Sequence, residues 1–347
     1  MAKSSRGSTA TAADVARLAG VSPGMVSRLL NGDETLRARE ETKERVRQAA
    51  AELDYTPNFA ARALRKAKAG VIGLAVHDAS NPVYSQIIAG AQAEATRAGY
   101  ALMLADVDAL ATDRTLFQRV VASGAIDGLL LQRAGTASDA PVAKIAAERV
   151  PTVLLNDRSR GAIGSVAVDD YGAARLAVAH LIELGHRDIG MLHVDGPANR
   201  TSPRRKGWAD ALAAAGLPAS DTRVVAGGHT PEAGYRGMTS LLASPHRPTA
   251  VFVANSFSAV GAIAAAHDAG VDVPGELSVI GLHDMALAEF LRPTLSVVRL
   301  PLFELGVRAV TLMLERLDDE PARHDRISDP APLLVVRAST APPPPAR

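Results

Sequence analysis

The sequence predicts an α/β protein in which a small N-terminal helical head precedes two doubly wound parallel-sheet lobes. Three observations support this fold class. Helix starts and stops follow one another closely in residues 12–66, and a basic charge excess falls in the same segment. From residue 70 onward, short apolar runs alternate with amphipathic segments. With 347 residues and 47% hydrophobic content, the chain is long enough for a head and two medium-sized lobes.

The head is expected to begin with a capped helix. Thr11 can cap a backbone N–H of the first turn, and Asp14 places an acid near the positive helix end. The apolar face of this helix is predicted to consist of Val15, Leu18 and Ala19. Residues 20–23 then supply a turn, a buried anchor, an N-cap and an N1 proline, so a second helix should start near Pro23.

The second helix is expected to end near Asn31-Gly32, where residues that tolerate positive φ stop a helix. Ser22, Ser27 and Arg28 should face outward, with Met25, Val26, Leu29 and Leu30 packing inward. Short hydroxyls can hold phosphates, and an arginine can bind a guanine edge in a major groove. A third helix, from about Glu40 to Leu53, would brace the other two.

Three ordered motifs resemble the lactose/galactose-repressor (LacI/GalR) family. They are Asp-Val-Ala-Arg-Leu-Ala-Gly-Val-Ser at 14–22, Val-Ser-Arg-Leu-Leu-Asn-Gly at 26–32, and Tyr-Thr-Pro-Asn with Ala-Ala-Arg-Ala-Leu within 55–64. The resemblance continues to residues 335–340. It implies a helix-turn-helix headpiece at 9–56, a hinge helix and linker at 57–69, and a two-lobed domain at 70–340 resembling periplasmic binding proteins.

The resemblance also implies that the hinge segment orders on operator DNA, where Leu64 from each of two subunits wedges into the minor groove. Such a wedge costs a few kcal/mol of unstacking, which new contacts offset. Alternatively, Leu64 is ordinary packing in an alanine-rich linker helix, although the neighbouring alanines offer it little to pack against. The candidate DNA contacts are Ser22, Pro23, Gly24, Ser27, Arg28, Asn31, Thr42, Tyr55, Asn58, Ala61 and Leu64.

Base readout is expected to depend mainly on one side chain. Where family members often place base-reading residues, this chain has Pro23 and Gly24, which offer no side-chain donor. Arg28 should therefore carry more of the direct readout, with Ser22, Ser27 and Asn31 mainly on phosphates. Charge supports DNA binding, because residues 1–68 carry 13 Lys/Arg against 8 Asp/Glu, whereas residues 69–347 carry 25 against 29. A solvated basic face is the common alternative for such a cluster.

Fully apolar strands between helices predict parallel sheets covered on both faces. The expected strands of the first lobe are 71–76, 101–105, 128–131 and 152–155, and those of the second are 189–192, 222–225, 250–253 and 277–280. Helices are expected at about 84–98 and 113–123. We place lobe 1 at about 70–164 and 298–322, lobe 2 at about 165–297 and 323–340, and a disordered proline-rich tail at 341–347.

Ligands of open α/β sheets bind beyond the carboxyl ends of the strands, where this chain has several polar residues. Turns alone also place polar residues there. Together with the resemblance, this position gives the effector-binding candidates Asp78, Tyr84, Asn156, Arg158, Arg204, Trp208, Asn255 and His283. Arg204 matches the family arginine that reaches the ligand, although it could instead be a solvated member of the basic run 204–206. His283 could equally be a loop residue.

Three departures from the family pattern bear on the effector. Val83 replaces the first aromatic of the Asn-Pro-aromatic-aromatic motif at 81–84, Ser256 replaces an aspartate, and His283 stands where Asp or Asn is usual. Fewer carboxylate acceptors and more donors, with Arg204 and Arg158 near the same cleft, favour an acidic ligand such as a sugar acid, a carboxylate or a phosphorylated metabolite. A neutral sugar is the alternative.

Other function classes are disfavoured. The absence of cysteine excludes disulfides and thiolate sites, and no nucleophile elbow, phosphate-binding loop or His-Glu-x-x-His pair is present. We therefore expect no enzyme activity, no cofactor and no metal site. The polar, basic first eight residues do not resemble a secretory signal, and the longest uncharged run, 248–266, reads as strand, loop and helix, so a cytoplasmic protein without membrane contact is expected.

These features together predict a homodimer that binds a near-palindromic operator, because two-fold symmetry requires matching half-sites. The proline-rich end cannot form a tetramerising helix. The expected function is repression of a catabolic operon, controlled by a sugar or sugar-acid effector between the lobes. A corepressor-dependent regulator, an activator and a solute-binding module without transcriptional role remain alternatives.

Overall fold

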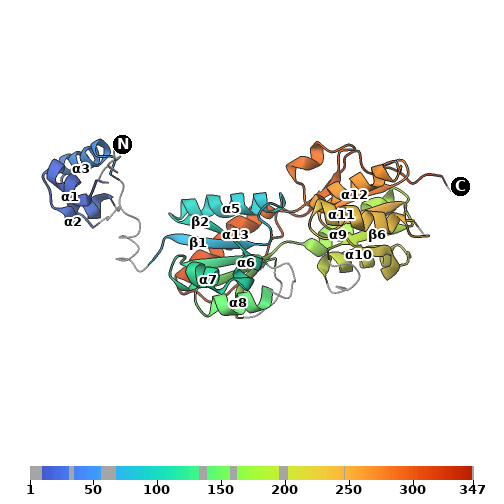
Figure 1. Ribbon diagram of the computed structural model, residues 1–347, viewed down its shortest axis with the longest axis horizontal. Helices are drawn as coiled ribbons and strands as arrows, with labels where there is room; N and C mark the ends of the chain where they lie inside the picture. Colours follow the sequence, from blue (N-terminus) through green and yellow to red (C-terminus); the bar gives the residue numbers. More distant parts are fainter. Residues whose placement is uncertain are drawn as a thin grey trace, which may run out of the picture. The chain divides into compact units, whose positions relative to one another are not determined.

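The computed structural model describes residues 10–30, 35–55, 68–132, 139–156, 162–194, 202–245 and 247–345. The chain divides into two compact units, Met1–Ala69 and Gly70–Arg347 (Figure 1). The first is the helical head and the second contains both lobes.

The head consists of α1 (Ala12–Ala19), α2 (Pro23–Leu30) and α3 (Glu40–Glu52). The Thr11 hydroxyl accepts from the Asp14 N–H, and the Asp14 carboxylate accepts from the Thr11 N–H, which completes the predicted cap. Gly20 ends α1 at φ 66°, a left-handed conformation that favours glycine. The core of the head consists of Val15, Ala16, Ala19, Val26, Val46, Ala49 and Ala50.

One predicted core residue of the head is exposed. Leu18, expected on the inward face of α1, has 49% of its surface exposed, while Ala16 is buried in its place. An eight-residue helix buries only a narrow stripe, and here the stripe runs through Val15, Ala16 and Ala19. Leu18 lies at the edge of that stripe, which apolar periodicity alone did not distinguish.

Each lobe is built on a sheet that has six strands within the described residues. The first sheet is parallel throughout and has the order β11-β5-β4-β3-β1-β2. Its strands are β1 (Val71–Val76), β2 (Ala101–Asp106), β3 (Gly128–Gln132), β4 (Thr152–Leu155), β5 (Gly164–Ala167) and β11 (His324–Arg326).

The second sheet has the order β12-β10-β9-β8-β6-β7, with only the β10–β12 pair antiparallel among the described pairings. Its strands are β6 (Ile189–His193), β7 (Val224–Ala226), β8 (Ala250–Val253), β9 (Ser278–Leu282), β10 (Ser296–Arg299) and β12 (Leu333–Val335). The predicted doubly wound lobes are confirmed, but the antiparallel edge strand was not anticipated. The chain passes between the sheets after β5, after β10 and after β11.

The lobe limits differ by a few residues from those expected. β5 and β11 pair within the first sheet, so residues 165–167 and 324–326 belong to lobe 1 rather than lobe 2. β10 pairs with β9 in the second sheet, so residues 298 and 299 belong to lobe 2 rather than lobe 1. The three crossings therefore follow Ala167, Arg299 and Arg326 instead of about 164, 297 and 322. The limits of the lobes are set by which strands pair in each sheet, and this pairing cannot be read from the sequence.

Helices cover both faces of each sheet (Figure 1). Lobe 1 carries α5 (Tyr84–Arg97), α6 (Val107–Thr112), α7 (Arg114–Phe117), a π-helical turn (Gln118–Ala122), α8 (Asp139–Ala147) and α13 (Leu302–Leu317). Lobe 2 carries α9 (Asp170–Glu183), α10 (Pro203–Ala214), α11 (Pro231–Leu242), α12 (Ser256–Asp268) and 3₁₀ turns at Asp221–Arg223 and Ala286–Glu289. The helix predicted at 113–123 is thus α7 and the π-helical turn. Within the described ranges, no helix is both long and apolar enough to cross a membrane.

The beginning of the predicted disordered tail is held against lobe 2. The Ala341 N–H donates to the Ser278 hydroxyl at 3.0 Å, and the Ala341 carbonyl lies 2.9 Å from His186 Nε2. Ser339, directly before, is fully buried and donates from its hydroxyl to the Val279 carbonyl. Ala341 was therefore wrongly assigned to a disordered tail, because these hydrogen bonds fix it to the sheet.

Helices α11 and α12 approach each other through glycines. A Cβ built on Gly261 would lie 1.7 Å from the Pro231 carbonyl oxygen, and one on Gly234 would lie 1.9 Å from the Ser258 carbonyl oxygen. We expect Gly261→Ala to lower the free energy of unfolding by up to about 2 kcal/mol, since an overpacking cost of about 1–3 kcal/mol exceeds a helix-propensity gain of about 1 kcal/mol. Urea unfolding measures this change. In the control Ala213→Gly, at an exposed position of α10 (Pro203–Ala214), only propensity is lost, and a stabilised Gly261→Ala protein would contradict the close packing.

Candidate functional site

The outward face of α2 carries the predicted DNA-contacting side chains. Ser22, Pro23, Gly24 and Arg28 are exposed, and Ser27 is half-buried, whereas Val26 is completely buried. The Ser22 hydroxyl accepts from the Met25 N–H at 3.2 Å and so caps the helix. As an acceptor here, the hydroxyl keeps its proton for donation, for example to a phosphate.

Arg28 is oriented by a residue that follows α2. Its Nη2 donates to Thr35 Oγ1 at 3.0 Å. A hydrogen bond to one edge of a guanidinium limits the rotamers of a side chain that is otherwise long and mobile. The exposed Arg28 is thereby held on the face that α2 presents to solvent.

Other DNA candidates lie partly inside the head or outside the described residues. Thr42 in the first turn of α3 is half-buried, as is Tyr55, which packs against the head core. Asn31, Asn58, Ala61 and Leu64, together with the effector candidate Arg158, fall outside the described residues. Their roles stay predictions.

Three of the effector candidates lie at the carboxyl ends of strands and have unusual backbone geometry. Asp78 follows β1, Asn156 follows β4 and His283 follows β9, with φ values of 53°, 57° and 78°. Left-handed conformations are uncommon for residues other than glycine and gather at ligand-binding sites and tight turns. This shared geometry at strand ends supports a site beyond the sheets.

Arg204, at the start of α10, is the centre of a polar cluster in lobe 2. Its Nε donates to Asp170 Oδ1 at 3.1 Å, its Nη1 donates to the Ala254 carbonyl at 2.7 Å, and its Nη2 lies 3.2 Å from His283 Nε2. The Arg204 and Asp170 side chains are only 14% and 16% exposed. The guanidinium is therefore a paired and largely buried group, rather than a solvated member of a basic run.

Asn255 and His229 extend this cluster toward lobe 1. Asn255 Oδ1 accepts from the Phe257 N–H at 2.8 Å and caps α12, while its Nδ2 lies 3.5 Å from His229 Nδ1. The His229 carbonyl accepts from Asn81 Nδ2 of lobe 1 at 3.2 Å. A second hydrogen bond between the lobes joins Gln86 Nε2 of α5 to the Asp284 carbonyl at 3.1 Å. The cluster thus lies where the two lobes meet.

Comparisons with known proteins agree with this architecture. A model described as "Bacterial regulatory proteins, lacI family" matches residues 11–58, and one described as "Periplasmic binding protein-like domain" matches residues 178–340. The HTH-type transcriptional repressor PurR of Erwinia tasmaniensis is 33% identical over 335 residues, covering 96% of this chain and 97% of the relative. The chain belongs to the lacI family.

Two solved structures of regulatory proteins match this chain over both of its units. The lac repressor dimer bound to operator and the anti-inducer ONPF matches with a TM-score of 0.77 and 27% identity, over 96% of this chain and 100% of that chain. The complex of the transcriptional regulator CelR with cellobiose matches with a TM-score of 0.68 and 28% identity, over 95% of this chain and 99% of that chain. The predicted family and fold class are confirmed, and this lacI-family protein is a DNA-binding transcription regulator, not an enzyme.

Three effector candidates of this lacI-family regulator lie outside the Arg204 cluster. Trp208 is completely buried in the core, beneath the Arg205 guanidinium, whose carbon lies 4.3 Å from the ring centroid. Tyr84 is buried in the core of lobe 1, at the start of α5. Asp78 is exposed and accepts from the Ser80 N–H in a turn. Their contact with an effector stays a prediction.

Two members of the cluster were not predicted. Asp170 follows β5, a four-residue strand that contains glycine and serine and lacks a continuous apolar run. His229 lies in the loop between β7 and α11. Both follow sheet strands, so the rule that polar residues collect at strand ends would have found them had β5 and the end of β7 been placed correctly.

Buried histidines predict acid sensitivity. Burial lowers the pKa of His180 and His186, and burial, Arg204 and His229 together hold the pKa of His283 well below its ordinary value. Below pH of about 6.5 the unfolded chain then binds more protons than the folded one, so stability should fall as the pH decreases from 7.5 to 5.5. Urea unfolding across this range tests the prediction. His267→Gln, at an 88% exposed side chain, should leave the slope unchanged, and higher stability at pH 5.5 would contradict it.

Proposed function

We propose that this lacI-family regulator represses a catabolic operon and is controlled by a sugar-type effector bound between its lobes. The observation that supports this proposal is the Arg204–His283–Asn255 cluster, which lies beyond the strand ends of lobe 2 and reaches lobe 1 through His229 and Asn81. A site shared by two lobes couples ligand binding to lobe closure, because a ligand that contacts both favours the closed arrangement.

The mechanism follows from linkage. The effector binds one lobe arrangement more tightly than the other, and this difference, typically about 1–3 kcal/mol, shifts the affinity for the operator. The hydrogen bonds from Asn81 and Gln86 to carbonyls of lobe 2 exist only while the lobes are together. We propose the inducer mode, in which effector binding releases the operator, with a corepressor as the alternative.

The charge of the cluster favours a neutral effector over the acidic one. The acidic expectation depends on Arg204 and Arg158 as cations in the cleft. Arg158 lies outside the described residues, and Arg204 is paired with Asp170 and also bonded to the Ala254 carbonyl. Asn255, Asn81 and His283 supply amide and imidazole groups, which suit hydroxyls. The cellobiose complex of CelR, with the same fold, is consistent with a sugar ligand in this regulator.

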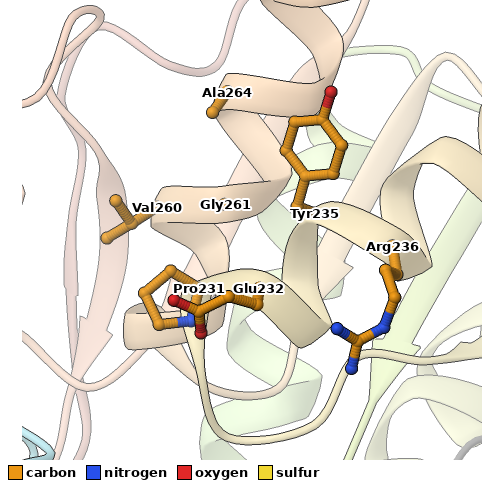
Figure 2. Close-up of a pocket in the computed structure, with 7 residues that line it drawn as sticks. All are labelled: Pro231, Glu232, Tyr235, Arg236, Val260, Gly261 and Ala264. Atoms are coloured by element: carbon orange, nitrogen blue, oxygen red, sulfur yellow. The ribbon is translucent and has the colours of Figure 1, made fainter.

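We further propose a homodimer, and the groove between α11 and α12 as part of its interface (Figure 2). The groove has a volume of about 430 Å³ and is lined by Pro231, Glu232, Tyr235, Arg236, Val260, Gly261 and Ala264. The apolar residues of the groove are bordered by the acid Glu232 and the base Arg236. Across a two-fold axis, the acid of one subunit can pair with the base of the other. Val260→Asp should then give monomers in analytical ultracentrifugation, whereas an unchanged dimer would place the interface elsewhere.

Operator footprinting with a metabolite panel tests the function. We expect protection of a near-palindromic sequence by the protein alone, and loss of protection when a neutral sugar is added. Protection that requires a metabolite would establish the corepressor mode. The absence of any sequence-specific footprint, with and without the panel, would refute the proposal.

A further inference from the structure

His283 is fixed in one neutral tautomer by its neighbour. An arginine guanidinium has only N–H donors, so the 3.2 Å contact between Arg204 Nη2 and His283 Nε2 requires Nε2 to accept. The single ring proton must then be on Nδ1. Burial of His283, at 4% exposure, and the nearby Arg204 and His229 keep its pKa low, which is consistent with a neutral ring.

The remaining nitrogen of this ring is an unused donor. His283 Nδ1 is completely buried, and no side chain or backbone atom in the part of the chain that the structure describes accepts from it. A buried donor without a partner destabilises the protein, so a ligand oxygen at this position would remove that penalty. The free amide oxygen of Asn156, at the end of β4 in lobe 1, is a buried acceptor in the same situation.

We propose that His283 is a specificity-determining residue that donates from Nδ1–H to an oxygen of an uncharged, polyhydroxylated effector. This inference rests on the proposed effector function of the same site. A carboxylate at this position would accept a hydrogen bond from a hydroxyl group of the ligand. The histidine instead donates a hydrogen bond to a hydroxyl or ring oxygen of the ligand. The substitution therefore reverses the hydrogen-bond polarity at this position.

Ser256 is the positioning residue for this histidine. Its buried hydroxyl lies 2.7 Å from the Leu282 carbonyl and 2.6 Å from the His283 carbonyl, and it donates to these acceptors. These contacts hold the chain where His283 adopts φ 78°. An ionised aspartate at position 256 has no proton to donate to these carbonyls, so the departures at 256 and 283 belong together.

The neutral character of the ligand follows from the charges around the ring. Arg204 is compensated by Asp170 at 3.1 Å, and the His283 ring is neutral, so neither supplies a free cation. An anionic ligand would lose its hydration shell on binding and would contact mainly neutral dipolar groups in exchange, which disfavours its binding. A hydroxyl group, in contrast, can accept from His283 and keeps its own proton for a neutral acceptor.

The tautomer is tested first, without any ligand. Two-bond ¹⁵N–¹H correlation spectra of histidine-labelled protein at pH 7 should show a ring with the Nδ1–H pattern that His283→Gln removes. His267→Gln, the exposed control, should remove a different signal. An Nε2–H ring or an imidazolium at His283 would overturn the proposal while leaving an operator footprint intact, so the two proposals fail independently.

Ligand selectivity is tested by calorimetric titration with cellobiose, ribose, galactose and glucose and with gluconate and galactonate. We expect a neutral sugar to bind best, His283→Gln to keep affinity within a few-fold because an amide N–H can substitute, and His283→Asp to lose about tenfold or more. Ser256→Ala should weaken binding of the same sugar while the Nδ1–H signal broadens or shifts. Tightest binding by an aldonate, equal affinity of His283→Asp, or no binding by either class would overturn the assignment.

Discussion

Trp208→Ala is expected to lower the free energy of unfolding of the two-lobed unit by about 3–5 kcal/mol, the usual cost of deleting a large aromatic side chain from a core. The Trp208 side chain has no exposed surface and belongs to the largest core cluster of this unit. Its removal also deprives the buried Arg205 guanidinium of the ring face 4.3 Å away. Urea unfolding followed by far-ultraviolet circular dichroism measures the loss.

Trp208→Phe is the matched variant that separates packing from ligand contact. It keeps a ring for the core and removes the indole N–H, which has no hydrogen-bond partner among the described residues. We expect a smaller loss of stability than for alanine, with effector affinity retained. If Trp208→Phe kept stability but lost affinity, the residue would be an effector contact, as the family resemblance implies. An unchanged unfolding midpoint for Trp208→Ala would contradict its place in the core.

Arg28→Ala is expected to weaken operator binding by about 1–3 kcal/mol, and mainly against one preferred base, because a bidentate arginine distinguishes guanine from the other bases. The exposed position of Arg28 on α2 and the lack of side-chain donors at Pro23 and Gly24 support this assignment. Competition binding with operators changed one base pair at a time measures the loss of discrimination. Equal weakening on every sequence would identify Arg28 as a phosphate contact.

Thr35→Val tests whether the hydrogen bond to Arg28 prepares it for the groove. Valine has nearly the same shape as threonine but cannot accept the bond from Nη2, which spans 3.0 Å. We expect a smaller loss of affinity than for Arg28→Ala, with base preference preserved. The control Arg17→Ala changes an exposed arginine on α1 that pairs with Asp14, and should reduce only the salt-dependent part of binding.

The sequence predicted the elements whose burial leaves a continuous apolar pattern. β1 and β8 have their expected limits because both faces of these strands are covered. β11, with the sequence His-Asp-Arg, and the short β5 were missed, since they are held by pairing near the edge of a sheet rather than by composition. β10 was missed although it is buried, because only two apolar residues stand between its serine and its arginine. The crossings between lobes depend on those strands and were displaced with them.

Individual residues of the candidate site could be predicted from the sequence, but the hydrogen bonds and ion pairs between them could not. Strand-end position identified His283, Asn255 and Asn156, whereas the pairing of Arg204 with Asp170 joins segments 34 residues apart. Ser256 was expected to weaken ligand acceptance; instead its hydroxyl bonds to backbone carbonyls of a strand end. Such partnerships arise from tertiary packing, which periodicity and composition do not encode.

The passages of the chain between the two sheets have a consequence for its synthesis. The sheet of lobe 1 begins at β1 but receives α13 and β11 only when residues 302–326 have been made, and lobe 2 receives β12 later still. Neither lobe can therefore complete its core until nearly the whole chain has been synthesised. The head is synthesised first and has its own core. A message truncated near residue 300 would yield a head able to fold, attached to two lobes that both lack an element.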